Sequence, residues 1–199
     1  GLAQKDYADL NPITPGMFGY SLLRPALHRE YFKDLYSMLP AFGIPLEGLH
    51  TETGNGVYEG AIHHADVVQA ADNGVLFKSA VKEIAYRHQF MASFMAKYNP
   101  ALPGCGGHVH QSLWDADQKR NLFYDAARKN KISALLEHYI AGQLYCMPFI
   151  MPMYAHNVNS YRRYAMNTWA PVSVTWSIEN RTTALRVVNS SEGMMNLET

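Results

Sequence analysis

Residues 106–112 constrain the interpretation of this 199-residue chain more than any other stretch. They read Gly-Gly-His-Val-His-Gln-Ser and follow a Pro-Gly pair. If they form a strand, the alternation of side chains places His108, His110 and Ser112 on one face. Two imidazoles and a hydroxyl there could bind a metal ion or hydrogen-bond a phosphate. The same spacing also fits two half-buried histidines with a structural role. The stretch alone does not distinguish the binding role from the structural role.

The composition excludes several classes of protein. Hydrophobic residues make up 48% of the chain, which is enough for a packed core and argues against disorder. A formal net charge of zero argues against a general nucleic-acid binder. Two cysteines without a CxxC pair predict a cytoplasmic protein without a disulfide scaffold. No run is long enough to predict a membrane span. Because the chain begins without methionine, we expect a piece of a longer protein.

Hydrophobic periodicity predicts an α+β fold rather than regular βαβ alternation. Helical spacing occurs at residues 29–39, 65–88, 132–144 and 159–164. Strand-like runs occur at residues 44–49, 90–95, 172–176 and 184–188. Pro148 and Pro152 are predicted to break the segment that follows the third helix.

A pair of glutamates flanks the strongest turn signal in the chain. Asn55-Gly56 is typical of a two-residue β-hairpin turn, and that turn would place Glu52 opposite Glu59. Directly opposed Cβ atoms lie roughly 4.5–5.5 Å apart, where like charges repel. A Mg²⁺ or Mn²⁺ ion would remove this cost, because both ions prefer oxygen ligands. The alternative is two exposed glutamates on a surface hairpin.

Arginines are concentrated near the end of the chain, at positions 162, 163, 181 and 186. Guanidinium groups match the oxygens of carboxylates and phosphates. Solvated surface charge is the alternative, and it fits Arg162 better than Arg181 or Arg186, which lie among apolar residues. Carboxylates, histidines and arginines together suit phosphoryl transfer. The chain has no GxxxxGK[ST] loop, so a nucleotide would not be held in the P-loop manner.

Five motifs in order resemble the catalytic domain of the glutamine synthetase family. They are Glu47 with His50-x-Glu52 and Gly56-x-x-Glu59; Gly104-x-Gly106-Gly107-His108-x-His110-x-Ser112-Leu113; Asn159-Ser160-Tyr161-Arg162-Arg163; Ala170-Pro171; and Asn180-Arg181-x-x-x-x-Arg186. The resemblance implies a ligase that phosphorylates the γ-carboxylate of glutamate with ATP and then joins it to an amine.

The resemblance also implies a role for individual residues. Glu52 and Glu59 would bind one Mg²⁺ or Mn²⁺ ion, and His108 and Glu198 would bind a second. The remaining expected positions are nucleotide contacts at Glu47, His110 and Ser112; substrate contacts at Gly104, Arg163 and Trp169; and phosphoryl-stabilising arginines at Arg181 and Arg186.

Three departures from the family pattern bear on substrate choice. Pro103 stands where the family has an asparagine that contacts glutamate, and Asn196 stands where it has an arginine. Trp169 aligns with the mobile-loop glutamate that accepts a proton from ammonium. Tryptophan cannot accept that proton, but it offers an apolar or cation–π face to a larger amine. We therefore expect an organic amine as acceptor, with ammonia as the open alternative.

The resemblance extends from about Pro15 to the end of the chain, and residues 1–199 are expected to be part of a catalytic domain. A small N-terminal domain, a Glu-x-Glu metal pair and a C-terminal remainder would lie outside this piece. The piece alone is therefore expected to lack a complete first metal site and to be inactive. The full-length protein would form a homo-oligomer of stacked rings. A non-catalytic relative with a structural or binding role stays an alternative. An unrelated metallohydrolase is disfavoured by the order of the motifs.

Overall fold

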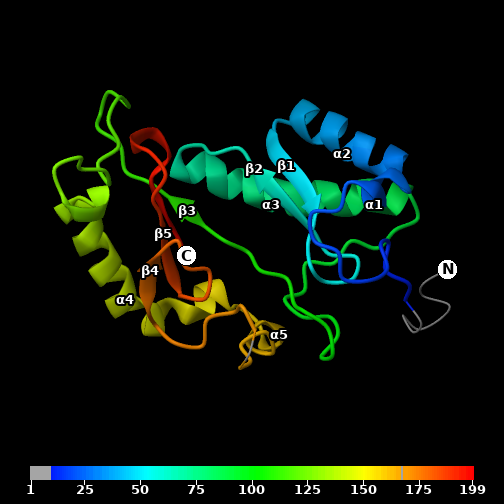
Figure 1. Ribbon diagram of the computed structural model, residues 1–199. Coiled ribbons are helices and arrows are strands. Elements are labelled where there is room, and N and C mark those ends of the chain that lie inside the picture. Colours follow the sequence, from blue (N-terminus) through cyan, green and yellow to red (C-terminus); the bar gives the residue numbers. More distant parts are fainter. Residues whose placement is uncertain (1–9, 167) are drawn as a thin grey trace. The chain divides into compact units, whose positions relative to one another are not determined.

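The computed structural model describes residues 10–166 and 168–199, and the chain divides into two compact units after Cys105 (Figure 1). Both units combine helices with small β-sheets, which confirms the α+β prediction. Among the residues described, none of the helices is both long and apolar enough to cross a membrane.

The first unit is built on a two-stranded antiparallel hairpin covered by helices. Its elements are α1 (Leu23–Ala26), α2 (Arg29–Ala41), β1 (Leu46–Thr51), β2 (Tyr58–Ile62) and α3 (Val67–Arg87). The buried core consists of Phe32, Leu35, Leu39, Ile44 and Ile84. Side chains of the hairpin, including Leu49 and Tyr58, pack against this core, so the hairpin is fixed to α2 and α3.

The second unit contains a four-stranded sheet in the order β3-β6-β5-β4. Its elements are β3 (His110–Gln111), the 3₁₀ helix η2 (Lys129–Lys131), α4 (Ala134–Tyr154), α5 (Val158–Tyr161), β4 (Trp176–Ile178), β5 (Leu185–Val188), the 3₁₀ helix η3 (Glu192–Met194) and β6 (Asn196–Glu198). Strands β4 and β5 are parallel, and the other two pairs are antiparallel. Leu185, Val187 and Leu197 pack with buried residues of α4 to form the core.

Most predicted elements are present with shifted ends, but two predictions are wrong. Residues 90–95 form no strand; Phe90 instead makes an edge-on contact with Tyr31, with ring centroids 5.2 Å apart. Helix α4 also continues through Pro148 and Pro152. Each proline removes one helical hydrogen bond. Burial of Met147 and of residues earlier in α4 offsets this loss, since packing supplies most helix stability. The predicted strand at 172–176 occurs instead as Trp176–Ile178.

The hairpin forms as expected, but its predicted register is wrong. Val57 N donates to Gly54 O at 3.1 Å and closes the turn, yet Glu52 N also donates to Val57 O at 2.8 Å. The first arm therefore holds two extra residues, and Glu59 lies opposite His50 instead of Glu52. A two-residue type I′ turn needs positive φ at both central residues, and only Gly56 has it, at +68°.

Candidate active site

The first cluster of candidate ligands lies at the hairpin and consists of His50, Glu52 and Glu59. The shifted register places His50 between the two carboxylates: its Nδ1 is 3.5 Å from Glu52 Oε1, and its Nε2 is 3.9 Å from Glu59 Oε2. Ligand atoms of all three residues lie within 4.8 Å of one another. Two carboxylates and one imidazole are a donor set that fits Mg²⁺ or Mn²⁺.

The second cluster is a row of three residues across neighbouring strands of the second unit. His110 on β3 pairs with Glu198 on β6, which pairs with Arg186 on β5. Arg186 Nε donates to Glu198 Oε2 at 2.7 Å, and Arg186 Nη2 donates to the same oxygen. Glu198 is buried, and its other oxygen, Oε1, lies 3.3 Å from His108 Nδ1. The strand order thus brings a carboxylate, a guanidinium and two imidazoles together.

The hydrogen bonds of His110 define which of its nitrogens carries the proton. Asn196 Nδ2 donates to Met194 O at 2.8 Å, which orients the amide so that its oxygen faces His110 Nδ1 at 2.9 Å. An amide oxygen only accepts, so Nδ1 donates and a neutral His110 has a lone pair on Nε2. That nitrogen lies 3.8 Å from Glu198 Oε2, an oxygen that Arg186 already contacts, so the lone pair on Nε2 is open to a hydrogen-bond donor of a ligand or to a cation.

Gly106 allows Arg163 to approach this cluster. A Cβ at position 106 would lie 3.1 Å from Arg163 Nη2 and 3.1 Å from His108 Nε2. Both contacts are closer than nine in ten real Cβ contacts, so a larger residue would make one of the two groups shift by a few tenths of an ångström. The absence of a side chain at Gly106 therefore keeps a guanidinium next to an imidazole. A guanidinium at this position could bind the oxygens of a carboxylate or a phosphate.

Other predicted site residues lie in loops. The carbonyl of Pro103, beside Gly104, lies against the hairpin turn, 3.5 Å from the position of a Cβ on Gly54. Ser112 Oγ accepts a hydrogen bond from Trp114 Nε1 at 3.0 Å.

The remaining two are exposed in the second unit. Arg181 lies in the connection between β4 and β5 and forms no ion pair with any residue that the structure describes. Trp169 exposes 72% of its surface in the segment after α5.

Comparison with known proteins decides the family. The model of the glutamine synthetase catalytic domain matches residues 8–199. This chain belongs to the glutamine synthetase family. Type-1 glutamine synthetase 2 of Dictyostelium discoideum is 45% identical over 191 residues, which cover 96% of this chain and 36% of that protein.

Other members of the glutamine synthetase family that match the chain include an amine ligase. Glutamate–isopropylamine ligase of a Pseudomonas species is 29% identical over 197 residues, or 99% of this chain and 43% of that protein. A solved structure of a novel glutamine synthase homolog superposes with a TM-score of 0.84 at 28% identity, over 95% of this chain and 45% of that one. The chain thus spans about two-fifths of the length of these relatives.

Sequence reasoning about this glutamine synthetase family member missed several contacts. His50 appears in a family motif, but it was given no role beside Glu52. The signal was present, because alternate residues of a strand share a face. The contact between Asn196 and His110 was not anticipated. His63 and His64, which lie beside Glu47, were also missed, because their approach depends on an irregularity in the hairpin.

Proposed function

We propose that the full-length protein is an ATP-dependent ligase that joins the γ-carboxylate of glutamate to an organic amine. One observation carries the proposal: ligand atoms of His108, His110 and Glu198 lie within 4.8 Å of one another, and the guanidinium of Arg186 donates to Glu198 beside them. A cation would bind between Glu198 and an imidazole, and the guanidinium would favour phosphate oxygens. Neither cysteine of the described residues forms a disulfide, which suits a cytoplasmic enzyme.

The proposed reaction has two steps. An oxygen of the glutamate γ-carboxylate attacks the terminal phosphorus of ATP, which breaks its bond to the bridging oxygen and releases ADP. The neutral amine nitrogen then attacks the acyl carbon of γ-glutamyl phosphate. Phosphate leaves with the C–O bonding electrons, and the nitrogen loses one proton. Divalent cations, when bound, would offset phosphate charge.

In this proposal Glu52 and Glu59 hold one cation, and His108 with Glu198 hold the other. The proposed nucleotide contacts are Glu47, His110 and Ser112. Gly104 and Arg163 would bind glutamate, and Arg181 and Arg186 would stabilise the transferring phosphoryl group. The closeness of Arg163 to His108 at Gly106 supports placing glutamate beside the second cation.

An organic acceptor is supported by Trp169, whose exposed indole offers an apolar face for an alkyl chain. The relative named glutamate–isopropylamine ligase agrees with that choice. The 45% identical relative is named a glutamine synthetase, so ammonia is the competing acceptor.

We also propose that both units are parts of one catalytic domain within a homo-oligomeric ring. Tyr145, Phe149 and Met153 lie one helical turn apart along α4, and all three are exposed. Such an apolar stripe is typical of a surface that the rest of a larger protein covers.

The reaction can be tested by measuring phosphate release from ATP in the full-length protein with and without glutamate and amine. We expect release to need both. Glu59→Gln should reduce kcat/KM by roughly 10²–10³-fold, because a cation ligand contributes several kcal/mol to stabilising the transition state. Glu83→Gln changes an exposed carboxylate on α3 and serves as the matched control.

The control should retain wild-type turnover. Phosphate release that does not depend on glutamate, or a fully active Glu59→Gln variant, would contradict the proposed reaction. A folded full-length protein without any turnover would instead favour the non-catalytic alternative.

A further inference from the structure

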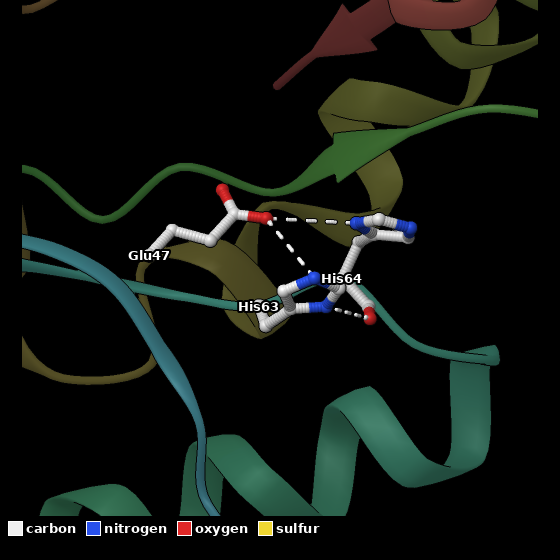
Figure 2. Close-up of side chains that lie close together, drawn as sticks. All are labelled: Glu47, His63 and His64. Carbon is white, nitrogen blue, oxygen red and sulfur yellow. Dashed lines mark hydrogen bonds and ion pairs between the residues drawn. The ribbon is translucent and has the colours of Figure 1, made fainter.

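A β-bulge turns Glu47 out of the regular hairpin ladder. Leu46 pairs with Ile62 and Gly48 pairs with Ala61, so Glu47 is an extra residue without a partner on β2. Bulges re-aim side chains in this way and are common beside functional sites. The carboxylate of Glu47 points toward the residues that follow β2, His63 and His64 (Figure 2).

The two histidines gather on the same side of the chain because β2 ends at Ile62. Within a strand, consecutive side chains point to opposite faces. Beyond its end, the rings of His63 and His64 stack with centroids 4.4 Å apart and planes 23° apart. His63 N donates to Pro45 O at 2.9 Å, which anchors the segment to the chain before β1. Two imidazoles are thus held beside one carboxylate.

The hydrogen bonds leave ligand-competent nitrogens facing the carboxylate. His63 Nδ1 lies 2.9 Å from His64 O, a carbonyl that can only accept, so Nδ1 donates and Nε2 of the neutral ring has the lone pair. That Nε2 is 3.9 Å from Glu47 Oε1, and His64 Nδ1 is 3.6 Å from the same oxygen. A backbone carbonyl on the remote nitrogen is the usual outer contact of a metal-bound histidine.

We infer that, when no nucleotide is bound at Glu47, the side chains of Glu47, His63 and His64 form a binding site for a first-row transition ion of the Zn²⁺ class, additional to the two cation sites of the proposed reaction. Two imidazoles and one carboxylate are a set that Zn²⁺ binds with a coordination position open. Mg²⁺ prefers oxygen ligands and would favour the hairpin cluster with its two carboxylates.

The ligand atoms of Glu47, His63 and His64 would have to move only slightly closer together to bind such an ion. Bond lengths of about 2.0–2.2 Å place tetrahedral ligand atoms roughly 3.2–3.6 Å apart. The two separations from Glu47 Oε1, 3.6 and 3.9 Å, are close to this range, all three ligand atoms lie within 4.8 Å of one another, and the side chains are exposed enough to adjust. The other carboxylate oxygen of Glu47, Oε2, points away from both rings (Figure 2). Oε2 would therefore not be needed as a ligand and would stay available for a hydrogen bond.

The site can be tested by Zn²⁺ titration of the full-length protein against a chromogenic chelator. Saturating Mg²⁺ would occupy the cation site with two carboxylates at the hairpin. The assay contains neither ATP nor glutamate. Its result therefore does not depend on the proposed reaction. We expect His64→Ala to weaken one Zn²⁺ site by at least ~10-fold, because it removes a direct ligand. His64 is 88% exposed, so this change should preserve the fold.

His63→Ala should cause a similar loss, since the second imidazole is also removed. His156→Ala changes an exposed histidine outside the cluster and is the control, which should titrate like the wild type. The inference would be overturned if both cluster variants retained the wild-type number and affinity of Zn²⁺ sites, or if the control lost the same site.

Discussion

Replacing Glu198 with alanine should lower the free energy of unfolding by about 3–5 kcal/mol. The side chains of Glu198 and Arg186 are only 9% and 12% exposed, and two guanidinium nitrogens of Arg186 donate to one carboxylate oxygen. Without that carboxylate, Arg186 keeps a desolvated charge with no counterion. Urea denaturation in the presence of a chelator would measure the loss without a contribution from bound cations.

The Arg128–Glu137 pair provides a matched control for this effect. Its N–O distance is 2.7 Å, but its side chains are 40% and 51% exposed. Glu137→Ala should therefore cost no more than about 1 kcal/mol. A double variant, Arg186→Met with Glu198→Leu, should recover much of the lost stability, because apolar residues often replace a buried ion pair without net cost. Equal losses in Glu198→Ala and Glu137→Ala would contradict the buried pair.

Replacing Trp169 with glutamate should shift acceptor preference toward ammonia. An apolar or cation–π contact to an organic amine is worth about 1–3 kcal/mol, which corresponds to roughly 10–100-fold in kcat/KM. The carboxylate introduced by Trp169→Glu cannot make that contact, but its negative charge attracts a small cation such as ammonium. We therefore expect the ratio of kcat/KM for ammonia to that for the best organic amine to rise by roughly 10–100-fold in the full-length enzyme.

Trp169→Phe is the control, because it retains an aromatic face at the same position. Its acceptor ratio should stay within about threefold of the wild-type value. If Trp169→Glu and Trp169→Phe both kept the wild-type ratio, the indole would have no part in choosing the amine, and that part of the proposal would fail.

The sequence predicts best what depends on neighbouring residues. The long helices follow from apolar spacing. The two-residue period of a strand predicts a common orientation of His108 and His110, although the strand that forms, β3, includes only His110 and Gln111. Both imidazoles do face Glu198. Hydrophobic periodicity also predicted the α+β fold, which the structure confirms.

Contacts across the chain were much harder to predict. The ion pair between Glu198 and Arg186 depends on β6 lying between β3 and β5, a strand order that no local pattern specifies. The hairpin register is set partly from outside, since Gly56 N donates to Thr14 O at 2.9 Å. The bulge at Glu47 likewise has no local signal, so the cluster with His63 and His64 emerged only from the structure.

The central claim is that this glutamine synthetase family member uses an organic amine. The most direct test compares kcat/KM for ammonia with kcat/KM for a broad panel of alkylamines, amino alcohols and polyamines, using the full-length protein with glutamate and MgATP. We predict that at least one organic amine exceeds ammonia and yields the corresponding γ-glutamyl amide. A higher kcat/KM for ammonia than for every amine in the panel would contradict the claim.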